Sequence, residues 1–189
     1  NRPQVIKTAW QKWENNKVID EFSRINEIKG QKSSRGRTLV APSKRRPLIY
    51  EALNQCMPGK WVKVDELMRF MQSKGLDFQV VRYPWKLYLG DPHYGHLDDY
   101  GSEPIIGSRY LLAFLFEYAA TLGLIDVAFT HPAGARMDFD HFYGGNDLEY
   151  LSRYDGLKYF RLNPLGAYVL GLSDKYDPPA FDPRPVLTV

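Results

Sequence analysis

Cysteine is nearly missing from this chain of 189 residues, and its scarcity excludes folds that depend on internal disulfides. Cys56 is the only cysteine, so no disulfide can form within the chain. This usage fits a reducing environment, and we expect a cytoplasmic protein. Cys56 occupies an apolar position, which favours a buried, unreactive thiol over a nucleophile.

Long apolar runs and targeting signals are also lacking. No segment approaches the roughly 18 apolar residues of a membrane-spanning helix, so we expect no membrane partner. No secretory or transit signal is present. The chain starts with Asn1 rather than Met, and both of its ends resemble mid-chain sequence. We therefore expect a fragment of a longer protein.

Complete metal-binding motifs are missing as well. His93 and His96 form an H-x-x-H pair in a polar loop, but a metal needs three or four convergent ligands, so an ordinary loop is favoured. The segment 138–149 has carboxylates at some positions of an EF-hand loop. Phe142 and Tyr143 stand where that loop needs a ligand and a glycine, so we expect no bound metal and no cofactor.

Catalytic constellations are incomplete too. His141 could form an acid–base pair with Asp138 or Asp140, but no nucleophile or phosphate-binding loop stands beside it. We therefore expect a protein that is not an enzyme. Asp147 is better explained as the cap of a short helix over 147–154.

Acidic residues are absent from 30–46, a segment that contains two Gly and one Pro. This composition predicts an exposed basic linker. Such a linker could contact phosphate, although a solvated segment that touches nothing remains the alternative. Its candidate nucleic-acid-binding residues are Lys32, Arg35, Arg37, Lys44, Arg45 and Arg46.

The charge is unevenly distributed along the chain. Residues 1–63 carry 14 Lys/Arg and 5 Asp/Glu, a balance of +9, whereas 64–189 carry 11 and 17, a balance of −6. The two parts sum to the net charge of +3. The first third could attract phosphate, while the remainder on average repels it.

Hydrophobic periodicity predicts a mainly helical α+β protein. Helices are expected over 5–14, 18–28, 48–56, 64–71 and from a cap at Ser108 to a stop at Gly123. Strand-like runs are expected at 61–62, 78–82, 85–89, 125–130 and 157–162. A last helix should start at Pro164, capped by Asn163, with Leu162, Leu165, Val169 and Leu170 buried.

This order of helices and strands resembles a winged helix-turn-helix domain over residues 46–172. Leu122-Gly123-Leu124-Ile125 is similar to the usual step from the third helix to the first wing strand. Arg161-Leu162-Asn163-Pro164-Leu165-Gly166 resembles the junction after the second wing strand. The segments 115–136 and 152–172 are also similar to winged-helix regions beside bacterial superfamily-2 helicases of the XPB type, although no helicase motif lies in this chain.

The resemblance implies a division of the chain into four parts. A winged-helix core over 47–172 would carry an enlarged wing loop over 131–156. A helical extension would occupy 1–29 and the basic linker 30–46. The Pro-rich tail, 173–189, predicts an extended linker.

The third predicted helix is unsuited to reading DNA bases. Arg109 is its only basic residue, and a helix that is apolar nearly all round is usually buried. Tyr110, Phe114 and Tyr118 form an aromatic ridge. Their side chains could pack in the core or bind a partner protein.

Two functions follow as hypotheses. The first is a non-enzymatic winged-helix module of a larger bacterial-type protein, associated with nucleic-acid transactions and binding DNA non-specifically through the basic segment. The alternative is a protein-interaction or oligomerisation module that acts without direct DNA binding.

Overall fold

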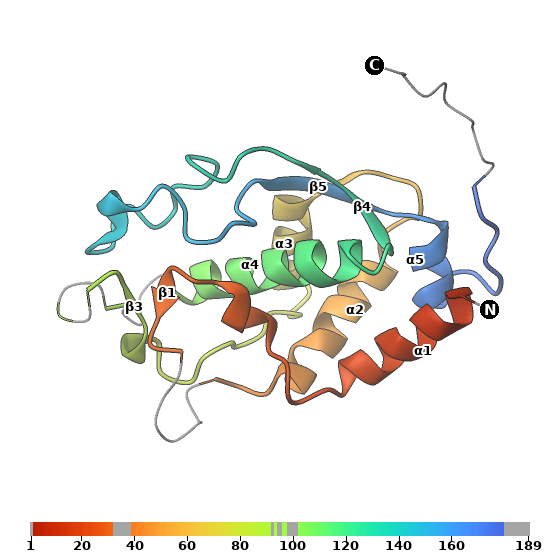
Figure 1. Ribbon diagram of the computed structural model, residues 1–189, viewed down its shortest axis with the longest axis horizontal. Helices are drawn as coiled ribbons and strands as arrows, with labels where there is room; N and C mark the ends of the chain where they lie inside the picture. Colours follow the sequence, from red (N-terminus) through yellow and green to blue (C-terminus); the bar gives the residue numbers. More distant parts are fainter. Residues whose placement is uncertain (1, 32–38, 92, 94–95, 98–101, 180–189) are drawn as a thin grey trace, which may run out of the picture.

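A computed structural model describes residues 2–31, 39–91, 93, 96–97 and 102–179 of the chain (Figure 1). It combines helices with short antiparallel strands, so the expected α+β class is confirmed. The α-helices are α1 (Arg2–Glu14), α2 (Arg46–Asn54), α3 (Val64–Ser73), α4 (Ser102–Ala113) and α5 (Pro164–Val169), and the π-helix η4 (Phe114–Ala120) continues α4. The strands are β1 (Ile28–Lys29), β2 (Val62–Lys63), β3 (Tyr88–Leu89), β4 (Ile125–Phe129) and β5 (Leu157–Leu162). Short 3-10 turns are η1 (Glu21–Arg24), η2 (Pro42–Lys44), η3 (Pro84–Lys86) and η5 (Gly145–Asp147).

A three-stranded antiparallel sheet has the order β2-β5-β4. Val62 pairs with Phe160 on one side of β5, and Val127 pairs with the same residue on the other side. Leu157, Phe160 and Leu162 are buried, because β5 is the central strand and turns these side chains toward the helices. The strand boundaries of β5 agree with the expected ones.

The junction after β5 is also confirmed. The Gly166 amide donates to Asn163 Oδ1 at 3.0 Å, so Asn163 caps α5, and Pro164 occupies the first helical position. Asn163 Nδ2 donates to the Gly123 carbonyl at 2.9 Å and links this cap to the end of the third helix. The expected burial is correct for Leu162 and Val169, whereas Leu165 and Leu170 are only half-buried.

Helix α4 lies at the centre of the molecule (Figure 1). It begins at Ser102, so the prediction that Ser108 caps it is wrong. Ser108 Oγ instead donates back to the Ile105 carbonyl at 2.8 Å, as a hydroxyl inside a helix does. Gly123 ends the helical segment with φ of +75°, a left-handed conformation that suits glycine.

Two predicted helices are absent from the described residues, because side chains compete with the helical hydrogen bonds there. In 18–28, Asn16 Oδ1 accepts from the amides of Val18 and Ile19, and only η1 and β1 form. In 147–154, Asp155 accepts the Leu151 amide at 3.0 Å, and η5 already ends at Asp147. Both segments still bury apolar side chains, but their backbone is not α-helical.

The strand-like run expected at 78–82 contributes only a single bridge, in which Val81 pairs with Leu39. Of the next expected run, 85–89, only Tyr88–Leu89 is a strand, β3, which pairs antiparallel with β1. Pro84 begins the η3 turn between them. A proline lacks the amide hydrogen that a continuous strand would need.

The N-terminal segment shares the core of the following residues. Phe22, Ile25 and Ile28 are 0%, 0% and 1% exposed, and η1 packs on α4. Helix α1 packs on α5 (Figure 1), with Tyr168 Oη donating to Gln4 Oε1 at 2.7 Å. Residues 2–29 therefore cover the helices rather than extend away from them. The tail after residue 179 lies outside the described part.

Candidate nucleic-acid interface

Arg45 and Arg46 do not lie in an exposed linker. Both are fully buried, and η2 and α2 begin in the segment where the linker was expected. Arg45 binds both carboxylate oxygens of Asp20, at 2.8 and 2.7 Å. The expectation of exposure is wrong for these two residues, and their guanidinium groups are not available to a phosphate.

Arg46 belongs to a buried polar network that ties the N-terminal segment to α2 and α4. Its Nε donates to Glu21 Oε1 at 2.7 Å, and Tyr110 Oη donates to Glu21 Oε2 at 2.7 Å. Burial opposes the charge on Arg46, but the hydrogen bond and charge of Glu21 outweigh it and raise the pKa of this guanidinium. Burial, followed by the Glu21 charge, raises the pKa of Tyr110 far above its ordinary value. These buried groups bond to one another, so the network holds the N-terminal segment against α2 and α4 and is not open to a ligand.

The remaining basic residues of the segment divide into two groups. Lys44 is exposed at the end of η2. Lys32, Arg35 and Arg37 lie outside the described residues, so their proposed role stays a prediction.

The aromatic ridge expected on the third helix is mostly buried. Tyr110 and Phe114 are both 0% exposed, and Phe114 packs edge-on against Trp10 with ring centroids 5.6 Å apart. Tyr118 is half-buried beside Trp13, at 4.6 Å, and accepts a hydrogen bond from Arg24 Nε. The expected partner surface is therefore wrong for Tyr110 and Phe114, because the N-terminal segment already covers them.

The long connection between β4 and β5 covers another side of α4. Arg109 is fully buried and donates to both carboxylate oxygens of Asp138, at 2.7 and 2.6 Å. Its Nε forms an ion pair with Asp155 Oδ1 at 3.0 Å. Burial raises the pKa of Asp155 despite the neighbouring Arg109. Phe139, 0% exposed, packs beneath the same guanidinium.

Helix α4 therefore offers little to a DNA groove. Residues 105–106 and 109–115 are buried, and both the N-terminal segment and the 131–156 connection contact them. A recognition helix needs polar side chains that reach base edges, and the one basic residue here is committed to two carboxylates. Any nucleic-acid contact must use another surface.

Another surface combines exposed aromatic and basic side chains in and beside the η3 turn. We call Arg82, Tyr83, Trp85 and Lys86 the basic aromatic patch. Tyr83 and Trp85 are 41% and 47% exposed, with ring centroids 5.1 Å apart. Lys86 Nζ lies 4.7 Å from the Tyr83 ring centroid, and Arg82 is exposed beside it.

Buried neighbours hold the patch in place. Val81, Pro84 and Leu87 alternate with the exposed residues and pack inward. The Leu87 amide donates to the Pro84 carbonyl at 2.8 Å, which closes the η3 turn. The exposed rings therefore project from an anchored backbone, so little conformational entropy needs to be lost on binding.

The basic segment is attached to the protein next to this patch. Leu39 bridges Val81, and the Val40 amide donates to the Val80 carbonyl at 2.9 Å. At the other end, β1 pairs with β3, two residues after η3. Neither 28–50 nor 78–90 contains an acidic residue. Among the described residues, Arg82 and Lys86 flank the two exposed rings, a combination that serves base stacking and phosphate contact.

The solvent face of the β2-β5-β4 sheet is a weaker candidate. Trp61 and Tyr159 are 47% and 38% exposed there. Arg161, however, donates to Asp126 at 2.7 Å and lies 4.9 Å from the Trp61 ring centroid. The guanidinium is already paired, so this face has less charge to offer to a phosphate.

Metal binding and a reactive cysteine, the other chemistries considered, find little support in the part of the chain that the structure describes. They contain no group of three His, Cys, Asp or Glu side chains placed to hold a metal. His96 Nδ1 lies 2.8 Å from the Trp85 carbonyl, and burial raises the pKa of Cys56 to about 11. A search of the same ranges also finds no helix long and apolar enough to cross a bilayer.

Comparisons with protein-family models, with curated proteins and with solved structures found no match.

Sequence reasoning missed the basic aromatic patch because it assigned 78–82 and 85–89 to strands. One signal could have found it. The motif Arg-Tyr-Pro-Trp-Lys, at 82–86, places a proline between two large rings and two basic residues. Proline in such a run favours a turn, and a turn leaves neighbouring side chains exposed.

Proposed function

We propose that this chain is a non-enzymatic winged-helix module that binds single-stranded nucleic acid, without sequence preference, through the basic aromatic patch. The observation that carries the proposal is the exposed Tyr83–Trp85 pair between Arg82 and Lys86, next to both attachment points of the basic segment. Neither cation pairs with a carboxylate in the described part of the chain. Stacking on such rings tolerates any base, because every base has an aromatic face.

The order of elements supports the winged-helix part of the proposal. Helices α2, α3 and α4 precede β4 and β5, and β2 adds to the sheet beside β5. The 131–156 connection would be the enlarged wing. A role in a larger bacterial-type protein that acts on nucleic acid rests on the sequence resemblance to winged-helix regions beside helicases.

The charge contribution can be tested with a labelled oligothymidine and fluorescence anisotropy over a range of salt concentrations. Binding should be weak and should decrease steeply with salt. The double variant Arg82→Ala/Lys86→Ala should lower the slope of log affinity against log salt by about 0.7 for each lost phosphate contact. Replacing Lys32, Arg35 and Arg37 should lower it further if they join the site.

The control is Arg69→Ala/Lys74→Ala, which removes the same charge from exposed positions in and after α3. Its slope should match that of the unmodified chain. An absence of binding at about 50 mM salt, where phosphate contacts are strong, would exclude the proposal. Equal losses in both double variants would mean that net charge, and not the patch, attracts the oligonucleotide.

A second candidate function is self-association. Phe129 is 61% exposed at the end of β4 and packs on Phe116 with ring centroids 5.0 Å apart. Two such surfaces could form a symmetric contact between copies. Light scattering should then show a dimer that Phe129→Glu dissociates, and a chain that stays monomeric at high concentration would rule this function out.

A further inference from the structure

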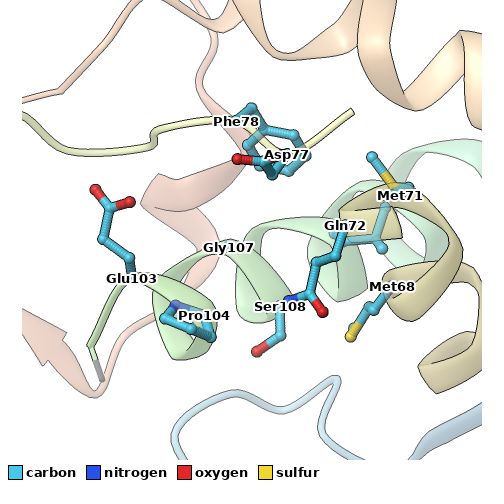
Figure 2. A pocket seen from close by; sticks show the side chains of 10 residues that line it. Met68, Met71, Gln72, Asp77, Phe78, Glu103, Pro104, Gly107 and Ser108 are labelled. Atoms are coloured by element: carbon cyan, nitrogen blue, oxygen red, sulfur yellow. The ribbon is translucent and has the colours of Figure 1, made fainter. Parts of the chain in front are cut away.

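A hollow of about 380 Å³ lies between α3 and α4, and none of its lining residues belongs to the basic aromatic patch (Figure 2). Its apolar walls include Met68, Met71, Phe78 and Leu111. The volume is within the range of small-ligand sites, roughly 300–1,000 Å³. Thioethers and an aromatic ring form adaptable walls for an apolar body.

Gly107 keeps the hollow open on the α4 side. It lies inside the helix, where glycine is less favourable than alanine. A Cβ built on Gly107 would have no atom within 4 Å, and the residue lines the hollow. A larger side chain at this position would therefore enter the hollow without displacing the backbone.

The charge of the hollow is negative. Asp77 and Glu103 are both exposed at its wall, while none of the lining residues is Lys, Arg or His. Figure 2 shows Glu103 at the left of the view, Asp77 beside Phe78 at the top, and the two methionines at the right. Neither carboxylate has a hydrogen-bond or ion-pair partner in the described residues. The positive end of α4 amounts to about half a charge, which two carboxylates outweigh.

We infer that this hollow binds a small organic cation: an amine carried on a compact aromatic or branched aliphatic body. The apolar body fits against Met68, Met71 and Leu111. The ammonium group lies toward Asp77 and Glu103, with the Phe78 ring available for a cation–π contact. This site is separate from the proposed nucleic-acid surface and does not depend on it.

Methionine methyl NMR tests the inference, because the methionines form a matched set. Met68 and Met71 line the hollow, whereas Met57 and Met137 are 65% and 45% exposed elsewhere. Titration with 2-phenylethylamine should shift the Met68 and Met71 signals saturably and leave the other two unchanged. The acid 3-phenylpropionate should produce no shift, and the neutral 2-phenylethanol should bind more weakly than the amine.

Two sets of variants complete the test. Asp77→Asn/Glu103→Gln should weaken amine binding about tenfold, the order expected for two exposed charge contacts, and leave the alcohol unaffected. Gly107→Leu should block binding of both the amine and the alcohol. Equal binding of amine, alcohol and acid would show an apolar hollow without charge selection and overturn the inference. Shifts of all four methionines together, or no saturable shift, would overturn it as well.

Discussion

At the scale of single residues, the buried arginines decide which charges are available for binding. Arg46 and Glu21 are both fully buried and form their ion pair at 2.7 Å. Removing one partner leaves the other charge without compensation in the interior. We predict that Arg46→Ala lowers the free energy of unfolding by about 3–5 kcal/mol in urea denaturation.

The control for this substitution is Lys44→Ala, two residues earlier and exposed. It should change the free energy of unfolding by less than about 0.5 kcal/mol. If the two variants were equally stable, Arg46 would be exposed to water, and it would return to the list of candidate phosphate contacts.

The reactivity of Cys56 follows from its environment. Burial raises its pKa to about 11, and its Sγ lies 3.6 Å from the Ala52 carbonyl. At pH 8 the thiolate fraction should be about 100-fold lower than for a cysteine with the ordinary pKa of 9.0, since about two pKa units separate the two thiols. Iodoacetamide labelling should therefore be slow in the native chain and fast in urea. Cys56 is half-buried, and rapid native labelling would contradict this shielding of its thiol.

At the scale of elements, the turn from β5 into α5 depends on a close approach of two backbone segments. A Cβ on Gly166 would lie 2.0 Å from the Leu124 carbonyl oxygen. We predict that Gly166→Ala lowers the free energy of unfolding by about 1–3 kcal/mol or more, because the backbone must move. Differential scanning calorimetry can measure the shift in Tm.

Gly107→Ala is the matched control, since Gly107 also lies in a helix but has open space at its Cβ. This substitution should stabilise the chain by up to about 1 kcal/mol through helix propensity. A destabilised Gly107 variant or an unaffected Gly166 variant would contradict the packing described at these two helices.

Elements could be predicted from the sequence where a local signal was strong. Asn163-Pro164 combines a cap with a first-turn proline, and β5 and α5 follow the expected boundaries. The prediction of a helix over 18–28 was wrong because the side chains of Asn16 and Asp20 accept hydrogen bonds from nearby amides. Hydrophobic periodicity does not reveal such side-chain hydrogen bonds. The burial of Arg45 and Arg46 was missed for a different reason. Their carboxylate partners lie 25 residues away in the sequence.

At the scale of the whole molecule, the N-terminal segment and the residues that follow the basic segment share one core. Phe22 and Ile25 are both 0% exposed and belong to the same buried cluster as Tyr110 and Phe114. We predict that the backbone amides of 20–28 exchange with deuterium as slowly as those of α4, because the two segments must unfold together. Fast exchange of 20–28 beside a protected α4 would contradict a shared core.

The shared core also explains why the candidate site could not be located from the sequence. The third predicted helix, already expected to be unsuited to reading DNA bases, is covered by segments far from it in the chain. The exposed basic aromatic patch, by contrast, comes from residues that were assigned to strands. Composition alone predicted a basic region, and the structure places its attachment points beside the two exposed rings.

The central claim is that single-stranded nucleic acid binds at the basic aromatic patch. Two tryptophans of equal exposure, Trp85 in the patch and Trp61 beside the sheet, provide the most direct measurement. The affinity for a labelled oligothymidine should fall by about 1–3 kcal/mol in Trp85→Ala, the contribution of one stacked base, and stay unchanged in Trp61→Ala. Loss of binding in Trp61→Ala with full binding in Trp85→Ala would contradict the claim.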